Sequence, residues 1–276
     1  MRTAEIFGIP IALTRKEALI GVVDSLLRSG RKGWICYANV HTLNLALSYP
    51  WLRRFYRSAL LNYCDGMGVK LGGRLLGIQI PERLTLPDFF DDLCRNAEER
   101  GYRLFFLGSS QESLKSCVQL LKSKFPRLLI SGYHHGYFDH SDGIDVIAAI
   151  RRAKPHLLFV GMGVPAQEKW VLRNFSSLDA SLIWMCGGVF ELLCGARSRA
   201  PRWMTQYGLE WLYRLLQEPR RLWKRYLIGN PFFACRLMRQ WLNQYLPGRS
   251  RHEGTSADEK RHPHRLTSSR LRVFVP

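Results

Sequence analysis

The chain has 276 residues, of which 46% are hydrophobic, so it can bury one large core, and intrinsic disorder of the whole chain is excluded. It carries 41 Lys plus Arg against 22 Asp plus Glu, a net charge of +19, which indicates a polyanionic partner: nucleic acid, an anionic membrane or a highly charged substrate. Residues 197–276 hold 17 of the basic and 5 of the acidic residues, a net charge of +12, which leaves +7 for residues 1–196. No apolar run approaches the about 18 residues of a spanning helix and no signal-peptide pattern follows Met1, so we expect a cytoplasmic protein.

Short apolar runs alternate with polar corners and stretches of helical periodicity. Each corner is rich in Gly, Asn, Asp or Ser, and the third run is followed by a helix expected over 111–124 and a strand over 128–131. This pattern predicts an α/β fold with a Rossmann-like, mostly parallel sheet and flanking helices, whose ligands bind beyond the carboxyl ends of the strands. The runs expected to form strands are 34–38, 60–64, 103–107, 156–160 and 181–186.

The C-terminal part differs in composition. From Pro201 the chain consists almost entirely of helix formers, and four of the eight tryptophans are interleaved there with arginines and lysines. Pro219 and Pro231 each follow an expected helix end, which predicts three short helices. We therefore divide the chain into an α/β catalytic domain, 1–196, a basic helical appendage, 197–246, and a disordered basic tail, 247–276.

Asp65 is the most informative single residue. It follows an apolar run and precedes Gly66, which places a carboxylate at a strand end, where partial burial raises its basicity toward that of a general base. The alternative is an Asp that only caps the next helix.

Uncharged polar side chains crowd the corner after the first run. Asn39, His41, Thr42 and Asn44 offer hydrogen-bond donors and acceptors that suit hydroxyl-rich ligands such as sugars. Asn39 or Thr42 could equally cap the following helix, and His41 alone fits a structural role better than a catalytic one.

Two glycine corners are candidate phosphate sites, because backbone N–H groups at a strand-to-helix junction attract anions. They contain Gly108 and Gly161, and neither is a complete GxGxxG or P-loop. Gly187, at the corner after the last predicted strand, is a further candidate substrate-binding residue. Gln167, just after the second corner, is a candidate hydrogen-bond partner for a base, ribose or sugar.

Neither a metal site nor a disulfide framework is expected. No Asp-x-Asp follows a strand, His134 and His135 lack carboxylate or thiol neighbours at ligand spacing, and the seven cysteines never form CxxC, so we expect them reduced and mostly buried. A diphosphate leaving group then needs arginines or helix dipoles. The candidate arginines are Arg83, Arg214, Arg221 and Arg225, the last three being close to one helical face if Pro219 does not turn the chain sharply.

Several motifs occur together in one order. They are NVHTLN at 39–44, DGMGV at 65–69, GMGVPAQE at 161–168, GGVF at 187–190, RAPRWM at 199–204, GLEWLYRL at 208–215 and EPRR at 218–221. Over about residues 5–245 the chain resembles the WecG/TagA/CpsF family of bacterial glycosyltransferases, glycosyltransferase family 26. It departs from the family at Leu86-Pro87, where a small, glycine-containing turn is expected, and after Leu246.

The resemblance implies an inverting, metal-independent transfer of a sugar from a UDP donor to a polyprenyl-diphosphate-linked sugar, without a cofactor, at the inner face of the bacterial plasma membrane. Asp65 would deprotonate the acceptor hydroxyl, and Thr42, Asn39 and Gln167 would line the sugar and nucleotide pocket. Arg83 would contact donor or acceptor. From the appendage, which would also dock on the anionic membrane, Arg214, Arg221 and Arg225 would neutralise the UDP diphosphate.

Alternatives remain open from the sequence. The charge and interleaved aromatic residues also fit a nucleic-acid-binding protein, although no RNP, KH or helix-turn-helix signature is present. A nicotinamide-dependent oxidoreductase would need a complete glycine fingerprint. The donor sugar could be N-acetylmannosamine, its uronic acid or glucose, and homo-oligomerisation is left open.

Overall fold

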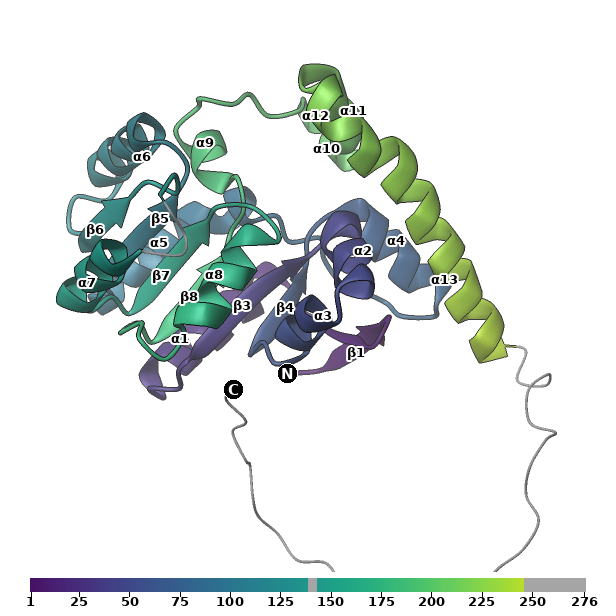
Figure 1. Cartoon of the computed structure of the whole chain (residues 1–276), viewed down its shortest axis with the longest axis horizontal. Helices are drawn as coiled ribbons and strands as arrows, with labels where there is room; N and C mark the ends of the chain where they lie inside the picture. The colour runs from purple at the N-terminus through teal and green to yellow at the C-terminus, as the bar shows by residue number, and fades with distance from the viewer. Residues whose placement is uncertain (139–142, 246–276) are drawn as a thin grey trace, which may run out of the picture.

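A parallel sheet with helices on both faces forms the body of the protein (Figure 1). The computed structural model describes residues 1–138 and 143–245, so the predicted tail lies outside the described residues. Within them, six strands run in the order β4-β3-β8-β7-β5-β6, with all neighbours parallel. The six strands are β3 (Gly33–Ala38), β4 (Leu61–Cys64), β5 (Leu104–Gly108), β6 (Ile130–His134), β7 (Leu157–Gly161) and β8 (Leu182–Met185).

The predicted α/β fold is confirmed. Each of the five apolar runs forms a strand, and the helix predicted over 111–124 is α6. An antiparallel hairpin that was not predicted, β1 (Thr3–Ile6) with β2 (Ile9–Ala12), packs beside β4. The helices up to the last strand corner are α1 (Lys16–Arg28), α2 (Val40–Ser48), α3 (Pro50–Arg57), α4 (Met67–Leu75), α5 (Leu86–Arg100), α6 (Gln111–Lys124), α7 (Ile144–Ala153), α8 (Ala166–Asn174) and α9 (Val189–Leu193).

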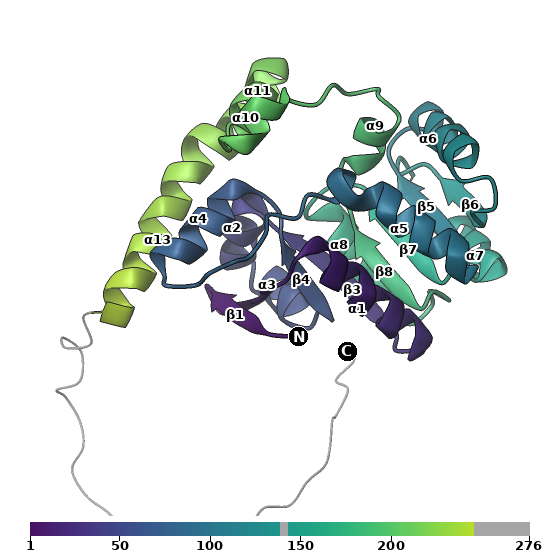
Figure 2. The same ribbon diagram turned by 180° about the vertical axis from the view of Figure 1, so that it is seen from behind.

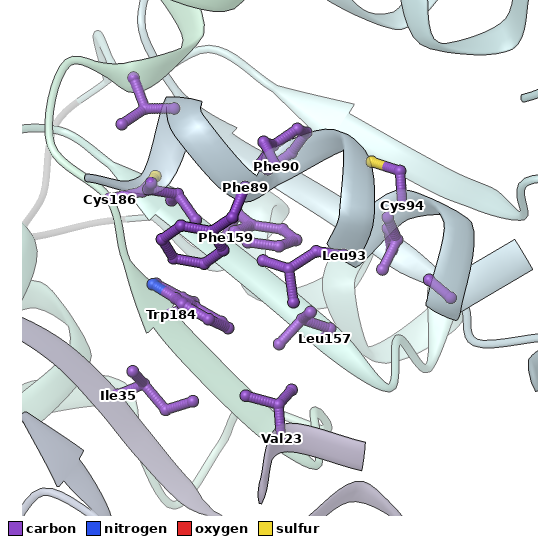
Figure 3. Close-up of a cluster of buried hydrophobic side chains, with 14 of the residues drawn as sticks. Val23, Ile35, Phe89, Phe90, Leu93, Cys94, Leu157, Phe159, Trp184 and Cys186 are labelled. Carbon is purple, nitrogen blue, oxygen red and sulfur yellow. The ribbon is translucent and has the colours of Figure 1, made fainter. Parts of the chain in front are cut away.

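Two apolar cores lie on opposite faces of the sheet, because successive side chains of a strand point to opposite sides. In one core, the rings of Phe159 and Trp184 stack with centroids 5.8 Å apart, and Phe89 of α5 packs against Trp184 (Figure 3). The other core joins the opposite strand faces to α2, α3, α7 and α8. Five of the seven cysteines are buried, as predicted.

The C-terminal helices are α10 (Arg202–Gln206), α11 (Glu210–Gln217), α12 (Pro219–Trp223) and α13 (Gly229–Tyr245). Pro219 opens α12 as predicted, but the break predicted at Pro231 is wrong. A π-helical turn, Lys224–Ile228, connects α12 to α13 without interruption, and Gly229 donates its backbone N–H to the Lys224 carbonyl, five residues back. A widened turn of this kind relieves the clash between a proline ring and the carbonyl four residues earlier.

The last helix packs along the body of the protein. Both views place α13 beside α4 and α2 (Figures 1 and 2), and its Phe233 and Leu237 are buried in the second core. Gln240 accepts a hydrogen bond from the backbone N–H of Phe7, 3.0 Å away. The N-terminal hairpin and the last described helix thus share one packed core with the sheet. No helix in the described ranges is long and apolar enough to cross a bilayer.

Candidate functional site

The strand corners meet at one edge of the sheet, because parallel strands present their carboxyl ends together. There they line a cavity of about 420 Å³, called the polar cavity below. The corner residues in its wall are Asn39 after β3, Asp65 after β4, Ser109 after β5, Gly161 at the end of β7 and Gly187 after β8.

A second cavity, of about 490 Å³, lies against α4, α11 and α13. We call it the apolar groove, and its apolar wall includes Met67, Leu71, Trp211, Phe233 and Leu237. The two cavities share one set of polar residues at their junction. These are Asn39, His41, Asp65, Glu210, Arg214 and Arg225.

Asp65 is held at this junction by its backbone and its neighbour. Its N–H donates to the Ala38 carbonyl at 2.8 Å, and Asn39 Nδ2 donates to Asp65 Oδ2 at 3.2 Å. Burial is the main cause that raises the pKa of this carboxyl group; the hydrogen bond from Asn39 opposes it, and Glu210 adds to it. A carboxylate of raised basicity that is reached from two cavities can accept a proton from a bound hydroxyl group.

Asn39 and Thr42 form a capping box at the start of α2. Thr42 donates its N–H to Asn39 Oδ1 at 3.0 Å, while Thr42 Oγ1 accepts from the Asn39 N–H at 2.9 Å. Thr42 is fully buried and lines neither cavity. Thr42 therefore lies behind the cavity wall, where it fixes the Asn39 amide so that its nitrogen faces Asp65, and its predicted contact with a ligand stays a prediction.

The other polar residues of this corner diverge. Asn44 Nδ2 donates to the Gly229 carbonyl at 2.7 Å, and Asn44 Oδ1 accepts from Arg236 at 2.9 Å, so Asn44 binds α13. His41 lines both cavities. Burial and the nearby Arg225 lower the pKa of His41 to about 4, so its ring is neutral near pH 7.

Gln167 also lies behind the cavity wall. It is fully buried; its Oε1 accepts the Gly187 N–H at 3.0 Å, and its Nε2 donates to Glu168 Oε1 at 2.9 Å. Oε1 of Gln167 therefore holds the Gly187 corner in place from behind the wall, and the predicted contact of Gln167 with a base or sugar stays a prediction. Glu168 beneath it is buried, and burial raises its pKa to about 7.

The glycines of three strand ends touch one another. A Cβ on Gly108 would stand 2.3 Å from the Gly161 carbonyl oxygen, and one on Gly161 would stand 2.6 Å from the Gly187 oxygen. Only glycine allows β5, β7 and β8 to end this close together. Gly161 and Gly187 line the polar cavity, whereas Gly108 supports them from behind and Ser109 takes its place in the wall.

Three predicted arginines converge on the polar cavity. Arg214, Arg221 and Arg225 all line it, although the chain turns at Glu218, where the backbone leaves the helical region (φ −133°, ψ 61°). Arg221 forms an ion pair with Glu218. The sequence predicted that the three arginines lie on one face of a straight helix. In the structure they line the same cavity although the chain turns between them.

Arg83 belongs to the apolar groove and not to the polar cavity. Its guanidinium group lies 3.3 Å from Asp88 and 3.3 Å from Glu210, so it links α5 to α11. Leu86-Pro87, where the sequence departs from the family, belongs to the first turn of α5. Arg83 still lies at the site.

Two charged residues at the site were missed from the sequence. Arg197 lines the polar cavity and bridges Glu191 (2.6 Å) and Glu218 (3.3 Å). Glu210 faces Asp65 at the junction and precedes Arg214 by four residues, one helical turn. That spacing could have identified Glu210, whereas Arg197 lies in a loop without periodicity. Among the described residues, no group of three or more His, Cys, Asp or Glu is placed to hold a metal ion.

Comparison with known proteins identifies the family of the chain. The sequence model of the glycosyl transferase WecG/TagA/CpsF family matches residues 4–247. The chain belongs to the WecG/TagA/CpsF family of glycosyltransferases. It is 34% identical over 250 residues to an N-acetylglucosaminyldiphosphoundecaprenol N-acetyl-beta-D-mannosaminyltransferase of Bacillus subtilis (strain 168), covering 88% of this chain and 94% of the relative. A protein with the same name from Staphylococcus aureus (strain MW2) is 29% identical over 192 residues, 70% of this chain and 73% of the relative.

Membership of the WecG/TagA/CpsF family confirms the resemblance found in the sequence. The chain is a glycosyltransferase, and its family links it to the synthesis of lipid-linked polysaccharides of the cell envelope. The nucleic-acid-binding and oxidoreductase alternatives have no support from these relatives.

Proposed function

We propose that this glycosyltransferase moves N-acetylmannosamine from a UDP donor to N-acetylglucosamine carried on a polyprenyl diphosphate, with inversion at the anomeric carbon. The observation that carries the proposal is the position of Asp65, where the polar cavity and the apolar groove meet opposite Arg214 and Arg225. The names of the Bacillus subtilis and Staphylococcus aureus relatives support the transferred sugar and the acceptor.

Of the three donor sugars that the sequence left open, we propose N-acetylmannosamine. The relatives carry that sugar in their names, whereas neither its uronic acid nor glucose is named. Asn39 and neutral His41 beside Asp65 suit uncharged hydroxyl and acetamido groups.

The proposed chemistry is one displacement. Asp65 takes the proton of the acceptor hydroxyl group as its oxygen forms a bond to the anomeric carbon, and the bond from that carbon to UDP breaks. The electron pair leaves with the UDP diphosphate. Because attack comes from the face opposite the leaving group, the configuration inverts, and an α-linked donor gives a β-linked product.

We propose that arginines stabilise the leaving diphosphate without a metal ion. Arg214, Arg221 and Arg225 line the polar cavity, and Arg197 adds a fourth guanidinium group to its wall. One guanidinium group can donate two parallel hydrogen bonds to the oxygens of a phosphate group. Backbone groups near Gly161 and Gly187 complete the cradle.

We further propose that residues 1–196 are the catalytic domain, that residues 197–246 complete its site, and that this appendage binds an anionic membrane from the cytoplasmic side. Trp223, Ile228 and Phe232 are exposed on the C-terminal helices, close in sequence to exposed Arg220 and Lys224. Tryptophan favours the headgroup level, and basic side chains gain free energy near an anionic leaflet.

The function is tested with purified protein, UDP-N-acetylmannosamine and a short-chain N-acetylglucosamine-diphosphate lipid, with UDP release as the signal. We expect Asp65→Asn to lower kcat by about 10²- to 10⁴-fold, the usual contribution of a general base. UDP binding, measured by calorimetry, should persist. Full activity of Asp65→Asn would remove Asp65 as the base, and loss of parent activity in EDTA would exclude the metal-free step.

A further inference from the structure

The apolar groove is built by three helices from distant parts of the chain. Leu71 and Leu75 come from α4, Trp211 from α11, and Phe233 and Leu237 from α13. Leu71 is 56% exposed and Leu75 is 43% exposed. Two large leucines on one helix face therefore remain in contact with water beside a cavity, where an apolar ligand would cover them.

Glycines on α4 bring the helices together at the floor of the groove. Gly68 and Gly72, one turn apart, both line it. A Cβ on Gly72 would lie 2.7 Å from Leu237 Cδ1 and 3.2 Å from Phe233. Contact between α4 and α13 thus closes the floor of the groove, while Leu71 and Leu75 beside it stay exposed.

The inner end of the groove is polar and continuous with the polar cavity. Asp65, Glu210 and Arg214 line both spaces, and Arg83 lines the groove alone. A ligand that fills the groove therefore needs a long apolar part, an anionic group near Arg83 and a polar head that reaches Asp65.

We infer that the apolar groove binds the first isoprene units of the polyprenyl acceptor, with its diphosphate near Arg83 and its sugar at Asp65. This inference rests on the proposed function, because that function supplies an acceptor with a prenyl chain, a diphosphate and a sugar in this order. It assigns the polar cavity to the nucleotide donor. Arg83 becomes an acceptor contact, which resolves the choice that the sequence left open.

The assignment predicts that affinity depends on the length of the prenyl chain even without a membrane. In detergent, we expect the KM for an N-acetylglucosamine diphosphate with a 15-carbon farnesyl chain to be at least about tenfold below that with a five-carbon chain, because each buried methylene strengthens binding. Leu71→Glu should abolish this advantage, so that the two acceptors have similar KM values. Ala234→Trp, which fills the groove from α13, provides a second variant.

The matched control is Leu172→Glu on α8, where the leucine is 47% exposed and lies outside both cavity walls. It introduces the same charge at a comparable exposed leucine. The farnesyl advantage should persist in this variant. Equal chain-length dependence in the parent and in both groove variants would overturn the inference.

A binding measurement separates this inference from the proposed function. Farnesyl diphosphate, which carries no sugar, should quench the fluorescence of Trp211 in the parent protein, and Trp211→Phe should remove that quenching. If no sugar is transferred but Leu71→Glu still weakens the quenching, the proposed function fails and the groove assignment stands. If transfer occurs without quenching, the assignment fails alone. Displacement of farnesyl diphosphate by a peptide of residues 246–276 would give the groove to that segment and overturn the inference.

Discussion

Opposing effects act on the pKa of the Asp65 carboxyl group. Burial and the negative charge of Glu210 raise its pKa, whereas the hydrogen bond from Asn39 and the charge of Arg214 lower it. A base must be ionised to accept a proton, so a raised pKa makes the carboxylate more basic but also requires a higher pH for activity. Glu210 is thus the residue whose removal changes this balance most simply.

We expect Glu210→Gln to move the acid limb of the kcat/KM profile to lower pH. The substitution removes a negative charge that raises the pKa of Asp65 and frees Arg83 from one of its two carboxylate partners. Both changes favour the ionised form of Asp65. Stopped assays across the acid range would measure the limb, since His41, with its pKa at about 4, stays neutral above that pH.

Glu99→Gln is the control for this profile, because Glu99 is exposed on α5, away from both cavity walls. Its acid limb should coincide with that of the parent. An unchanged limb in Glu210→Gln would mean that Asp65 does not set the pH dependence.

The sequence predicted which corners form the site but not which side chains face it. Asp65 and Asn39 line the cavities as expected, because their corners end neighbouring parallel strands. Thr42 and Gln167 lie in the first turns of α2 and α8 and face inward, where they bind the backbone. Spacing along the chain does not tell which side of the first turn of a helix faces the cavity, so this division required the structure.

At the scale of elements, α13 decides whether the groove exists. It contributes Phe233 and Leu237 to the second core, and the Phe233 ring meets Phe7 edge to face at 5.5 Å. The adjacent residue, Phe232, is 56% exposed. Neighbouring phenylalanines on one helix therefore have opposite environments and form a natural pair for comparison.

Phe233→Ala should lower the free energy of unfolding by about 3–5 kcal/mol, the usual cost of deleting a buried aromatic ring. Phe232→Ala should change it by less than about 1 kcal/mol, because that ring is mostly exposed. Urea denaturation followed by circular dichroism measures both values. Similar losses in the two variants would contradict the docking of α13 through Phe233.

The strands were predictable because each is an apolar run followed by a polar corner, but two elements were not. The β1–β2 hairpin turns at Phe7 and Gly8, which both have positive φ angles (56° and 72°). Such turns are usually recognised by Asn-Gly or Asp-Gly, and phenylalanine gives no such signal. The continuous helix through Pro231 was not predicted, because no residue spacing in a sequence identifies a π-helical turn.

For the whole molecule, part of the net charge of +19 lies on two surfaces of the C-terminal helices. Arg214, Arg221 and Arg225 face the polar cavity, whereas Arg220 and Lys224 are exposed beside Trp223. The first group suits a nucleotide diphosphate and the second an anionic bilayer. The basic composition therefore does not require a nucleic acid.

We expect Arg220→Glu with Lys224→Glu to weaken binding to phosphatidylglycerol vesicles at least about tenfold, since each basic residue contributes about 1 kcal/mol near an anionic surface. Vesicle sedimentation at low and high salt measures this effect. The double substitution Arg151→Glu with Arg152→Glu on α7 makes the same charge change at exposed positions elsewhere. Equal loss in both double variants would attribute the binding to net charge alone.

The hydrogen bond from Phe7 to Gln240 joins residues that are 233 positions apart in the sequence. A ribosome completes the sheet and its Asp65 before it adds the arginines of the C-terminal helices. A chain that ended before these helices would have the Asp65 corner but would lack the cationic wall and the floor of the groove. Both cavities are therefore complete only when the last described helix packs against the first hairpin.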